Sequence, residues 1–472
     1  MFEKDIEGFG IGTQEDVAEL NKALTTGYEQ TTSMTGGAAL RVQSLESTLK
    51  LLTFREDHMV VWKDIAKLPA YSTVEEYSQQ TSIGSDNPGF TGEGVAPEED
   101  DSNYARKASL VKFLGTTRKI THPAQLVHTI NGDVVAREST NGILKVMRDA
   151  EFGLLWGNSD LVYTAAGTTP EGVEFDGLNT LIDAANDLDL SNRNLEESDF
   201  THMGETIAAS FGYINRCYVP NSVASTLDVG MLPKERISLP GPNGVEVGTT
   251  VGAVKTSFGR VAVRPSLFMG PQLASGRSPK KQPPAAATST KAPAAPASIA
   301  TSAMTGTDGL FRASQVGVIK FKATACNRYG ESAPTAATAD LTIGAGDIAK
   351  HIPLTITNSA SSETVIPDYF NVYATEAGGA VYYLVATVVC TLKTNSGTGA
   401  TYSYTGYIMP NTAICFAGQF DSEILVFKQL APIMKMDLAV IEPSYRFMVL
   451  MYGVPQLFAP KKLMRVINVK DF

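Results

Sequence analysis

Histidine is the side chain best suited to acid–base and metal chemistry near neutral pH, and here its spacing favours neither. The five histidines are His58, His122, His128, His202 and His351. None has a second histidine three or four residues away, as a zinc site on one helix face requires. Folding could bring His122 and His128 together, but surface or capping roles are commoner for such residues. Asp57 and His58 could supply the acid and the base of a catalytic triad, but no motif in the sequence identifies a nucleophile.

A glycine-rich segment, Gly344-Ala-Gly-Asp-Ile-Ala349, fits the fingerprint that binds the pyrophosphate of a dinucleotide. That chemistry needs a helix N-terminus directly after the glycines. The next residues, Lys350 to Ile356, include a proline and β-branched side chains and predict a strand. The segment is therefore interpreted as a hairpin turn. Gly8-Phe-Gly-Ile-Gly12 also fails the pattern, because no strand precedes it.

Acidic and aromatic residues give no stronger signal. The run Glu98-Glu-Asp-Asp101 lacks the spacing of an EF-hand, and a solvated charge cluster is the favoured interpretation. Glu75 and Glu76 are neighbours on a predicted strand and therefore face apart. Trp62 and Trp156 lie in apolar runs and are expected in the core. The sequence thus predicts no catalytic, cofactor-binding or metal-binding residues, no cofactor and no enzymatic activity.

Composition narrows the class of protein. The chain has 472 residues, which predicts two to four domains, and 43% of them are hydrophobic, which excludes disorder throughout. Only 19% are charged, a low value that suggests burial against other subunits. Lys and Arg number 39 against 49 Asp and Glu, so the net charge is -10 and general nucleic-acid binding is not expected.

Cysteine usage and the chain start predict the compartment. Cys217, Cys326, Cys390 and Cys415 lie far apart without a CxxC motif, so we expect reduced structural thiols. No apolar run approaches the ~20 residues that span a bilayer. The acidic start Met1-Phe2-Glu3-Lys4-Asp5 does not have the features of a signal peptide. Synthesis and use in a cytoplasm are therefore expected.

The first part of the chain predicts extended pieces with little core of their own. Residues 1–55 are expected to form an arm that packs on something else. Ser72–Tyr77 and Ser109–Leu114 predict two strands of a long hairpin, with a polar loop of roughly thirty residues between them. That loop is either disordered or ordered by a partner. Met59–Trp62 predicts a short strand, and the apolar stripe over 130–160 predicts a long helix.

The middle of the chain predicts a mixed α/β body. Helices are expected over Thr180–Ala185 and Glu205–Phe211, the second with Ser198-Asp-Phe200 as its N-cap region. Strands are expected at Cys217–Pro220 and Gly259–Arg264.

A sharp change of composition follows. Residues 271–298, rich in Ala and Pro, predict a semi-extended linker in which Arg277, Lys280 and Lys281 have no acid near them in sequence. Residues 299–418 alternate short strands with Gly, Ser and Asn turns and predict a β-sandwich. Its predicted strands are Val318–Ala323, Ile352–Thr357, Tyr369–Tyr373 and Tyr382–Thr387.

The remaining C-terminal residues are apolar helix and strand candidates that complete the domain begun before residue 270. The sandwich is therefore expected to be an insertion. Ala325–Pro334 resembles a turn of fibronectin type III modules, but it comes early in the segment, so only an immunoglobulin-like sandwich is inferred.

Outside the arm and the insertion, over residues 38–270 and 419–472, the sequence resembles the major capsid proteins of tailed bacteriophages, which have the Hong Kong 97-type fold. The likeness is greatest to Twort-type phages with contractile tails, whose capsid proteins carry a similar insertion. It rests on the order of several weak motifs: Gly94-Val-Ala-Pro97, Glu174-Phe-Asp-Gly-Leu178 with Leu181-Ile-Asp183, Leu430-Ala-Pro-Ile-Met-Lys435, Ala459-Pro-Lys-Lys462 and Arg465-Val-Ile-Asn-Val469.

The resemblance implies an α+β fold with named parts. Residues 1–55 are the N-terminal arm. Residues 56–165 and 442–472 form the peripheral domain, with an extended loop at 66–118 and a spine helix at 130–160. Residues 166–270 and 419–441 form the axial domain, 271–298 the linker, and 299–418 an inserted immunoglobulin-like sandwich. No motif assigns a Lys–Asn cross-link.

The resemblance also implies a function. The chain is expected to self-assemble into hexamers and pentamers of an icosahedral head shell, which encloses double-stranded DNA without binding it specifically. Scaffold, portal and decoration proteins are expected partners, no membrane is expected, and the shell is expected to assemble in the host bacterial cytoplasm and to remain in the virion. The insertion is expected to project outward. Two alternatives are open: a surface or secreted β-sandwich module that binds glycans, and a component of a contractile tail.

Overall fold

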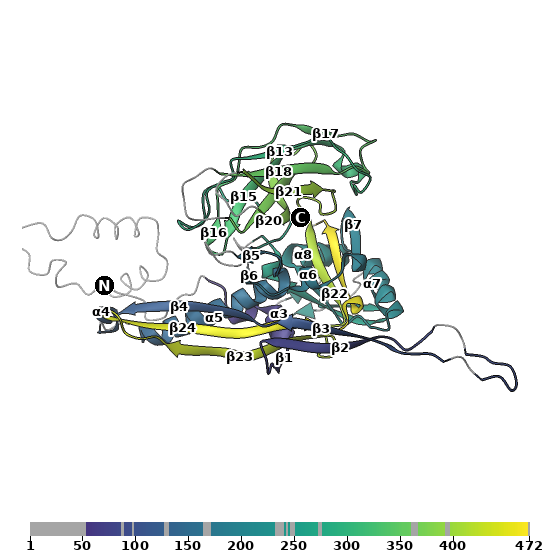
Figure 1. The fold of residues 1–472 in the computed structure, drawn as a ribbon, viewed down its shortest axis with the longest axis horizontal. Helices are drawn as coiled ribbons and strands as arrows, with labels where there is room; N and C mark the ends of the chain where they lie inside the picture. Colours follow the sequence, from purple (N-terminus) through teal and green to yellow (C-terminus); the bar gives the residue numbers. More distant parts are fainter. Residues whose placement is uncertain are drawn as a thin grey trace, which may run out of the picture. The chain divides into compact units, whose positions relative to one another are not determined.

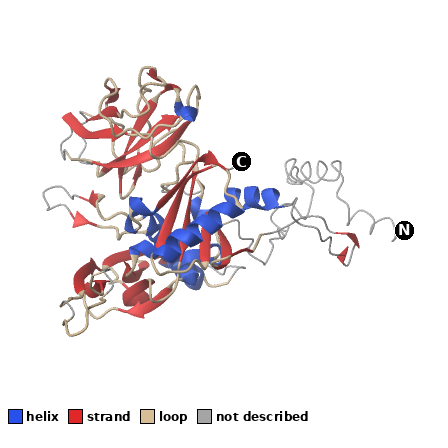
Figure 2. Ribbon diagram, turned by 90° about the vertical axis from the view of Figure 1, so that its right-hand side faces the viewer, coloured by secondary structure: helices blue, strands red, loops and turns tan. Residues whose placement is uncertain are grey.

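The structure is a computed structural model that describes residues 53–85, 89–96, 99–126, 132–163, 171–231, 240–241, 244–245, 251–271, 276–359, 367–391 and 397–470. Most of the expected arm, His128, Pro97 and Glu98 lie outside these residues. Figure 1 shows the order of the elements, and Figure 2 distinguishes helices, strands and loops by colour. Within the described residues, no helix combines the length and the apolar character needed to cross a bilayer.

One sheet has four strands in the order β1-β23-β24-β4. They are β1 (Ala66–Pro69), β23 (Leu425–Asp437), β24 (Ser444–Leu457) and β4 (Lys112–Thr121). β24 pairs antiparallel with both β23 and β4, and β1 joins the edge in parallel. Strands β2 (Val74–Ser82) and β3 (Asn103–Leu110) form a separate antiparallel hairpin, with Val74 opposite Leu110. In Figure 1 this hairpin extends away from the end of the four-stranded sheet. The predicted long hairpin is confirmed, but its second strand is β3, and the expected strand Ser109–Leu114 covers the end of β3 and the start of β4.

The predicted long helix is α5 (Val134–Trp156). Its buried residues Gly142, Val146, Ala150 and Leu154 recur every four residues and form one stripe against the rest of the protein. Gly142 allows close contact with the four-stranded sheet, because a Cβ there would lie 2.9 Å from Val449 Cγ2. Three short helices precede α5 in the chain: η2 (Glu56–His58), α3 (Val60–Asp64) and α4 (His122–Leu126).

The second large sheet has six strands in the order β11-β12-β8-β22-β25-β7. They are β11 (Ala253–Thr256), β12 (Gly259–Ser266), β8 (Arg216–Pro220), β22 (Ala413–Gly418), β25 (Leu463–Val469) and β7 (Asp187–Arg193). Helices α7 (Glu197–Ala209) and α8 (Asn221–Met231) share its core through Phe200, Met203, Ile207, Val223 and Leu227. Smaller elements are β5 (Val162–Tyr163), β6 (Glu171–Gly172), α6 (Leu178–Leu181), η3 (Ala184–Asn186), β9 (Pro240–Gly241), β10 (Gly244–Val245), η5 (Leu267–Met269) and η7 (Pro460–Lys462).

The insertion is an all-β domain, called the β domain below. One sheet has the order β13-β18-β21, a second β16-β15-β19-β20, and β14 pairs with β17. The bounds are β13 (Ser298–Thr301), β14 (Gly317–Ile319), β15 (Phe321–Asn327), β16 (Gly330–Glu331), β17 (Leu341–Ile343), β18 (Ile352–Asn358), β19 (Tyr369–Thr375), β20 (Tyr382–Val389) and β21 (Gly397–Tyr404), with a short helix η6 (Ala313–Gln315). Side chains of all three sheets share one apolar core.

Several expected boundaries differ from the structure. The expected axial residues 419–441 contain β23, which pairs with β24 and β1 in the four-stranded sheet. The expected peripheral C-terminus contains β25, which lies in the six-stranded sheet, and so does β22, expected in the insertion. Apolar strands look alike locally, and only pairing with distant strands decides which sheet they join.

Three local expectations were wrong. Met59–Trp62 begins a helical turn, because the Glu151 side chain accepts the backbone N–H groups of Val61 and Trp62. Helix α7 begins at Glu197, with Glu196 as N-cap, well before the expected start at Glu205. The expected helix at Thr180–Ala185 is split into α6 and η3.

Candidate assembly surfaces and the insertion junction

The inner part of the β2–β3 hairpin is bonded to the residues at the end of β24. There, the Tyr77 hydroxyl donates to the Leu457 carbonyl at 3.0 Å, and the Tyr77 ring packs edge-on against Phe458. Further out, Ile83 is 87% and Phe90 93% exposed. Large apolar side chains that face water singly are ordinary, but a series of them along one hairpin marks an interaction surface.

The carboxylates on this hairpin have local roles. Glu75 accepts the N–H groups of Tyr71 and Ser72, at 2.7 and 3.0 Å. Glu76 forms an ion pair across the hairpin with Arg106. The two glutamates therefore have different partners, as their alternation on the strand predicts, and they do not form an acid–base pair.

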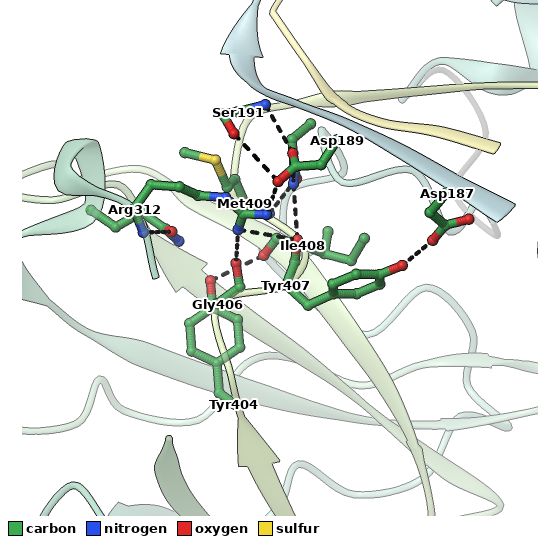
Figure 3. Close-up of polar contacts among 11 residues, drawn as sticks. Asp187, Asp189, Ser191, Arg312, Tyr404, Gly406, Tyr407, Ile408 and Met409 are labelled. Carbon is green, nitrogen blue, oxygen red and sulfur yellow. Dashed lines mark hydrogen bonds and ion pairs between the residues drawn. The ribbon is translucent and has the colours of Figure 1, made fainter. Parts of the chain in front are cut away.

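The junction between the β domain and the six-stranded sheet is polar, and Figure 3 shows its centre. Arg312, which precedes η6, donates from Nη1 to the Gly406 carbonyl at 2.6 Å and forms an ion pair through Nη2 with Asp189 of β7. Arg312 is 18% and Asp189 31% exposed, so water screens this pair only in part. Burial alone raises the pKa of Asp189, but hydrogen bonds from Asn468 and Ser191 and the Arg312 guanidinium hold it below its usual value.

Asn468 is the central residue of this junction. It is fully buried in β25 and has a φ of 56°. Its Nδ2 donates to Asp189 Oδ1 at 2.8 Å and to the Tyr407 carbonyl at 2.9 Å, while its Oδ1 accepts the Met409 N–H at 2.8 Å. The Asn468 side chain thus connects the segment after β21, which contains Tyr407 and Met409, to strands β7 and β25 of the six-stranded sheet. Asparagine tolerates this left-handed backbone better than most residues.

A second group of contacts, centred on Asp187 of β7, joins the β domain to the six-stranded sheet. Asp187 accepts from Arg465 Nη2 at 2.6 Å and from Nε at 3.0 Å, and Tyr407 also donates its hydroxyl to Asp187. Burial and the nearby Asp187 carboxylate raise the pKa of Tyr407 to about 12. Arg465 Nη1 donates to the Asn179 carbonyl at 2.6 Å. The C-terminal motif that begins at Arg465 therefore meets the region that follows the Glu174–Leu178 motif.

Arg277 connects the expected linker to the end of α5. Its Nη1 and Nη2 donate to the two carboxylate oxygens of Glu174 at 2.8 and 2.9 Å, and Nη1 also reaches the Trp156 carbonyl at 2.6 Å. Its guanidinium lies over the rings of Phe152 and Tyr369. A bidentate, stacked arginine of this kind compensates the charge of its partner and also fixes the relative position of the segments that it contacts.

Lys281 continues this connection into the β domain. Its Nζ donates to Glu331 Oε2 at 2.7 Å, and both side chains are less than a tenth exposed. Burial alone raises the pKa of Glu331, but Lys281 and hydrogen bonds from Thr324 and Tyr373 keep it below its usual value. The expected linker is therefore packed: two of its basic residues, Arg277 and Lys281, have acidic partners that are far away in sequence.

Glu151 is the buried acid of α5. Its two carboxylate oxygens accept the N–H groups of Val61 and Trp62, at 3.0 and 2.6 Å. Burial, with a smaller contribution from Asp64, raises its pKa to about 7 despite these hydrogen bonds. Glu151 thus fixes α3, and through it β1, to the long helix.

The residues that sequence suggested for chemistry do not come together. His58 accepts the Arg55 N–H, Asp57 pairs with Lys63, and His351 pairs with Asp308. Gly344–Lys350 is followed by a strand, β18, and not by a helix, as predicted. It is not a hairpin turn, because β17 pairs with β14 while β18 pairs with β13 and β21. Trp62, Trp156 and the four cysteines are buried, and the cysteines are free thiols. Over the described residues, no cluster of three His, Cys, Asp or Glu is placed to hold a metal.

Sequence reasoning missed the junction residues Asp187, Asp189, Arg312, Tyr407 and Asn468. They are single polar residues scattered over almost 300 positions, and only strand pairing brings them together. The one sequence signal was the motif Arg465–Val469, which includes Asn468.

Comparison with known proteins gives the family. The sequence model of the SU10 major capsid protein family matches residues 22–282, more than half of the chain. The major capsid protein of Staphylococcus phage K is 27% identical over 463 residues, covering 97% of this chain and 95% of the relative. That of Staphylococcus phage S25-3 gives the same values.

Solved structures of similar arrangement include two capsids. One is the capsid of a native GTA particle, with TM-score 0.47, 8% identity and coverage of 93% of this chain and 99% of the other. Another is the capsid of Myoviridae phage XM1, with TM-score 0.43, 9% identity and coverage of 90% and 96%.

The predicted relationship to tailed-phage major capsid proteins, with the greatest likeness to those of Twort-type phages, is confirmed by the family match and these relatives. The long hairpin, the long helix and the mixed α/β character agree with the predicted α+β capsid fold. The chain therefore belongs to the SU10 major capsid protein family, and it is a structural protein of the phage capsid.

Proposed function

We propose that this chain assembles into hexamers and pentamers of an icosahedral head shell that encloses double-stranded DNA, and that its role there is structural, without catalysis. The observation that carries this proposal is the β2–β3 hairpin, which exposes Ile83 and Phe90 among its described residues. A closed shell needs heterologous contacts repeated around rings. A hairpin that reaches over a neighbouring subunit provides such contact area beyond the compact body.

The hairpin gives the direct test. Full-length chain is expressed with its neighbouring reading frames, which supply a scaffold protein, and particles are counted by negative-stain electron microscopy. Replacing Ile83 and Phe90 together with Ser should abolish closed shells while leaving the melting temperature unchanged, because neither side chain packs within the subunit. The matched control is Tyr329→Ser, a partly exposed aromatic of the β domain. Normal shells from the hairpin variant, or a stable monomer from the wild type, would contradict the proposal.

We further propose that the β domain faces the outside of the shell, since inside it would compete with DNA for volume. The turn at Gly346 offers open space, because a Cβ there would meet nothing within 4 Å. A peptide tag inserted after Gly346 should be bound by its antibody on intact, DNA-filled particles. Binding only after the particles are disrupted would place the domain inside. Scaffold, portal and decoration proteins remain proposed partners.

A further inference from the structure

Glu331 of β16 brings an amine and an amide together inside the β domain. Its Oε2 accepts from Lys281 Nζ at 2.7 Å, and its Oε1 accepts from Asn371 Nδ2 at 3.0 Å. Lys281, Glu331 and Asn371 are 6%, 5% and 3% exposed, so bulk water is largely excluded from all three side chains. A primary amine and a carboxamide are therefore held on the two oxygens of one buried carboxylate.

The backbone of Lys281 is fixed on both sides. Its N–H donates to the Ser278 carbonyl at 2.9 Å, and its carbonyl accepts the Leu384 N–H of β20 at 2.9 Å. From there the side chain extends to Glu331, where the ion pair holds its amine. The amine has little freedom left to lose, and such positioning raises the rate of a reaction between two neighbouring groups.

Strand pairing positions the amide of Asn371 in β19. Asn371 lies opposite Thr324 of β15 and Thr387 of β20, so the three side chains share one face of the sheet. The Thr387 hydroxyl donates to Asn371 Oδ1 at 3.1 Å, and the Thr324 hydroxyl donates to Glu331 Oε1 at 2.6 Å. The amide is thus bonded at both ends, through its oxygen to a hydroxyl and through its nitrogen to the carboxylate.

These hydrogen bonds give each atom a role in an exchange of amides. Glu331 can accept a proton from the Lys281 ammonium, which leaves a neutral amine able to attack Cγ of Asn371. The same carboxyl group can then donate that proton to Nδ2, the leaving nitrogen to which it is already bonded. The Thr387 hydroxyl donates to Oδ1, the oxygen on which negative charge develops in the tetrahedral intermediate.

We propose that Lys281 and Asn371 become joined by an isopeptide bond inside each subunit. The bond between Lys281 Nζ and Asn371 Cγ forms, and the bond between Cγ and Nδ2 breaks. The lysine nitrogen gives up two protons, of which one leaves with ammonia and the other stays on Glu331, so the buried site ends neutral. The reaction needs no further reactant. It also needs no second subunit, and it is therefore independent of the proposed shell assembly.

The bond would change what holds the β domain closed. It links residues 90 positions apart and closes a loop that contains β13 to β18. A cross-link stabilises chiefly by restricting the unfolded chain, and more so when the loop is long. The competing interpretation is a buried ion pair that never reacts, which predicts that the mass of the chain is unchanged.

The first test measures the intact mass of the full-length, denatured protein. The wild type should be lighter than its sequence by one ammonia, and digestion should yield a branched peptide that contains both Lys281 and Asn371. Lys281→Arg keeps a positive charge beside Glu331 but removes the nucleophile, so it should lose no ammonia, and any other processing cancels in the comparison. Asn371→Ala should also lose none. An unchanged wild-type mass, or loss of ammonia without the branched peptide, would overturn the inference.

The second test asks where and how the bond forms. The linked fraction is followed with time after synthesis, at high and at low chain concentration. The rate should be the same at both, and linked chains should remain monomers on denaturing gels. A ladder of linked subunits would overturn the placement of the bond within one subunit.

A threonine variant tests the assigned chemistry. Thr387→Val keeps the shape of the side chain but removes the donor to Asn371 Oδ1, so the bond should form more slowly by about tenfold or more. The control is Thr391→Val, which removes a hydroxyl bonded to the Gly399 carbonyl in the same domain and should form the bond at the wild-type rate. An unchanged rate in Thr387→Val would overturn the role given to Thr387.

Discussion

At the scale of single residues, the distinctive feature is a set of buried charges that hold distant segments together. Three ion pairs do this: Arg277 with Glu174, Lys281 with Glu331, and Arg465 with Asp187. Each joins segments at least 50 positions apart in sequence. Buried ion pairs add little net stability compared with apolar packing, but a pair that loses one partner leaves a costly uncompensated charge. Their effect here is to fix how segments meet.

Glu151 provides a pH-dependent prediction. Its pKa is about 7 in the folded chain because of burial, against an ordinary 4.5, so the folded state binds the proton more tightly than the unfolded state does. The free energy of unfolding should therefore fall as pH rises from about 4.5 to 7, by up to about 3 kcal/mol from this group alone. Glu151→Gln should remove the pH dependence that Glu151 causes. It should also destabilise the chain at pH 5, because the NH2 group of the glutamine would face a backbone N–H group that a carboxylate oxygen of Glu151 accepts in the wild type.

The measurement is the difference in melting temperature between wild type and Glu151→Gln, taken from pH 5 to pH 8. The advantage of the wild type should be largest at pH 5 and should shrink towards pH 8. Glu138→Gln, a partly exposed glutamate of the same helix paired with Arg118, is the control. A difference between wild type and Glu151→Gln that stays constant with pH would show that Glu151 keeps its charge throughout.

At the scale of elements, the β domain begins and ends at other residues than the sequence predicts. The domain was expected at 299–418, yet β22 at 413–418 lies between β8 and β25 in the six-stranded sheet. The chain enters and leaves at one place, because the Asn411 N–H donates to the Pro279 carbonyl at 3.2 Å. The natural boundaries are therefore near Pro279 and Asn411.

These boundaries predict the outcome of two deletions. Removing 280–410 and joining Pro279 to Asn411 with a short glycine linker should leave a folded chain that still forms shells. Removing 299–418 should give insoluble protein, because it deletes a central strand and leaves β8 and β25 without their shared neighbour. Soluble yield, circular dichroism and electron microscopy distinguish the cases. Loss of shells from the folded 280–410 deletion would instead make the β domain part of the lattice contacts.

The elements that sequence predicted well are those with a strong local pattern. The hairpin, α5, β8, β12 and three strands of the β domain, β18, β19 and β20, follow from alternation or helical spacing. The sheet to which β23 and β25 belong does not, because β23 also pairs with β1 and β25 with β7, and both of these partners are distant in sequence. The same reason hid the junction: Asp189 and Arg312 are 123 positions apart and have no pattern that links them.

At the scale of the whole molecule, the net charge disfavours contact with nucleic acid, whereas the exposed apolar side chains favour contact with protein. The chain has a net charge of -10, which discourages contact with other polyanions, while Phe90, Ile83 and Phe211 are almost fully exposed and favour contact with other protein surfaces. A subunit of this kind gains its affinity from apolar anchors and interlocking segments. Assembly should therefore depend only weakly on salt, in contrast to nucleic-acid binding.

The contrast gives a final prediction for free subunits and DNA. Binding to duplex DNA depends on Lys and Arg that displace counterions from phosphates, and it weakens steeply as salt increases. With 49 acidic against 39 basic residues, free subunits should show no measurable affinity for a fluorescent duplex at physiological salt in anisotropy titrations. Any binding at low salt should disappear as salt is added, and the hairpin variant should behave as the wild type does. Tight binding that persists at physiological salt would mean that a local basic surface overrides the net charge, and that the shell holds its DNA by direct contact.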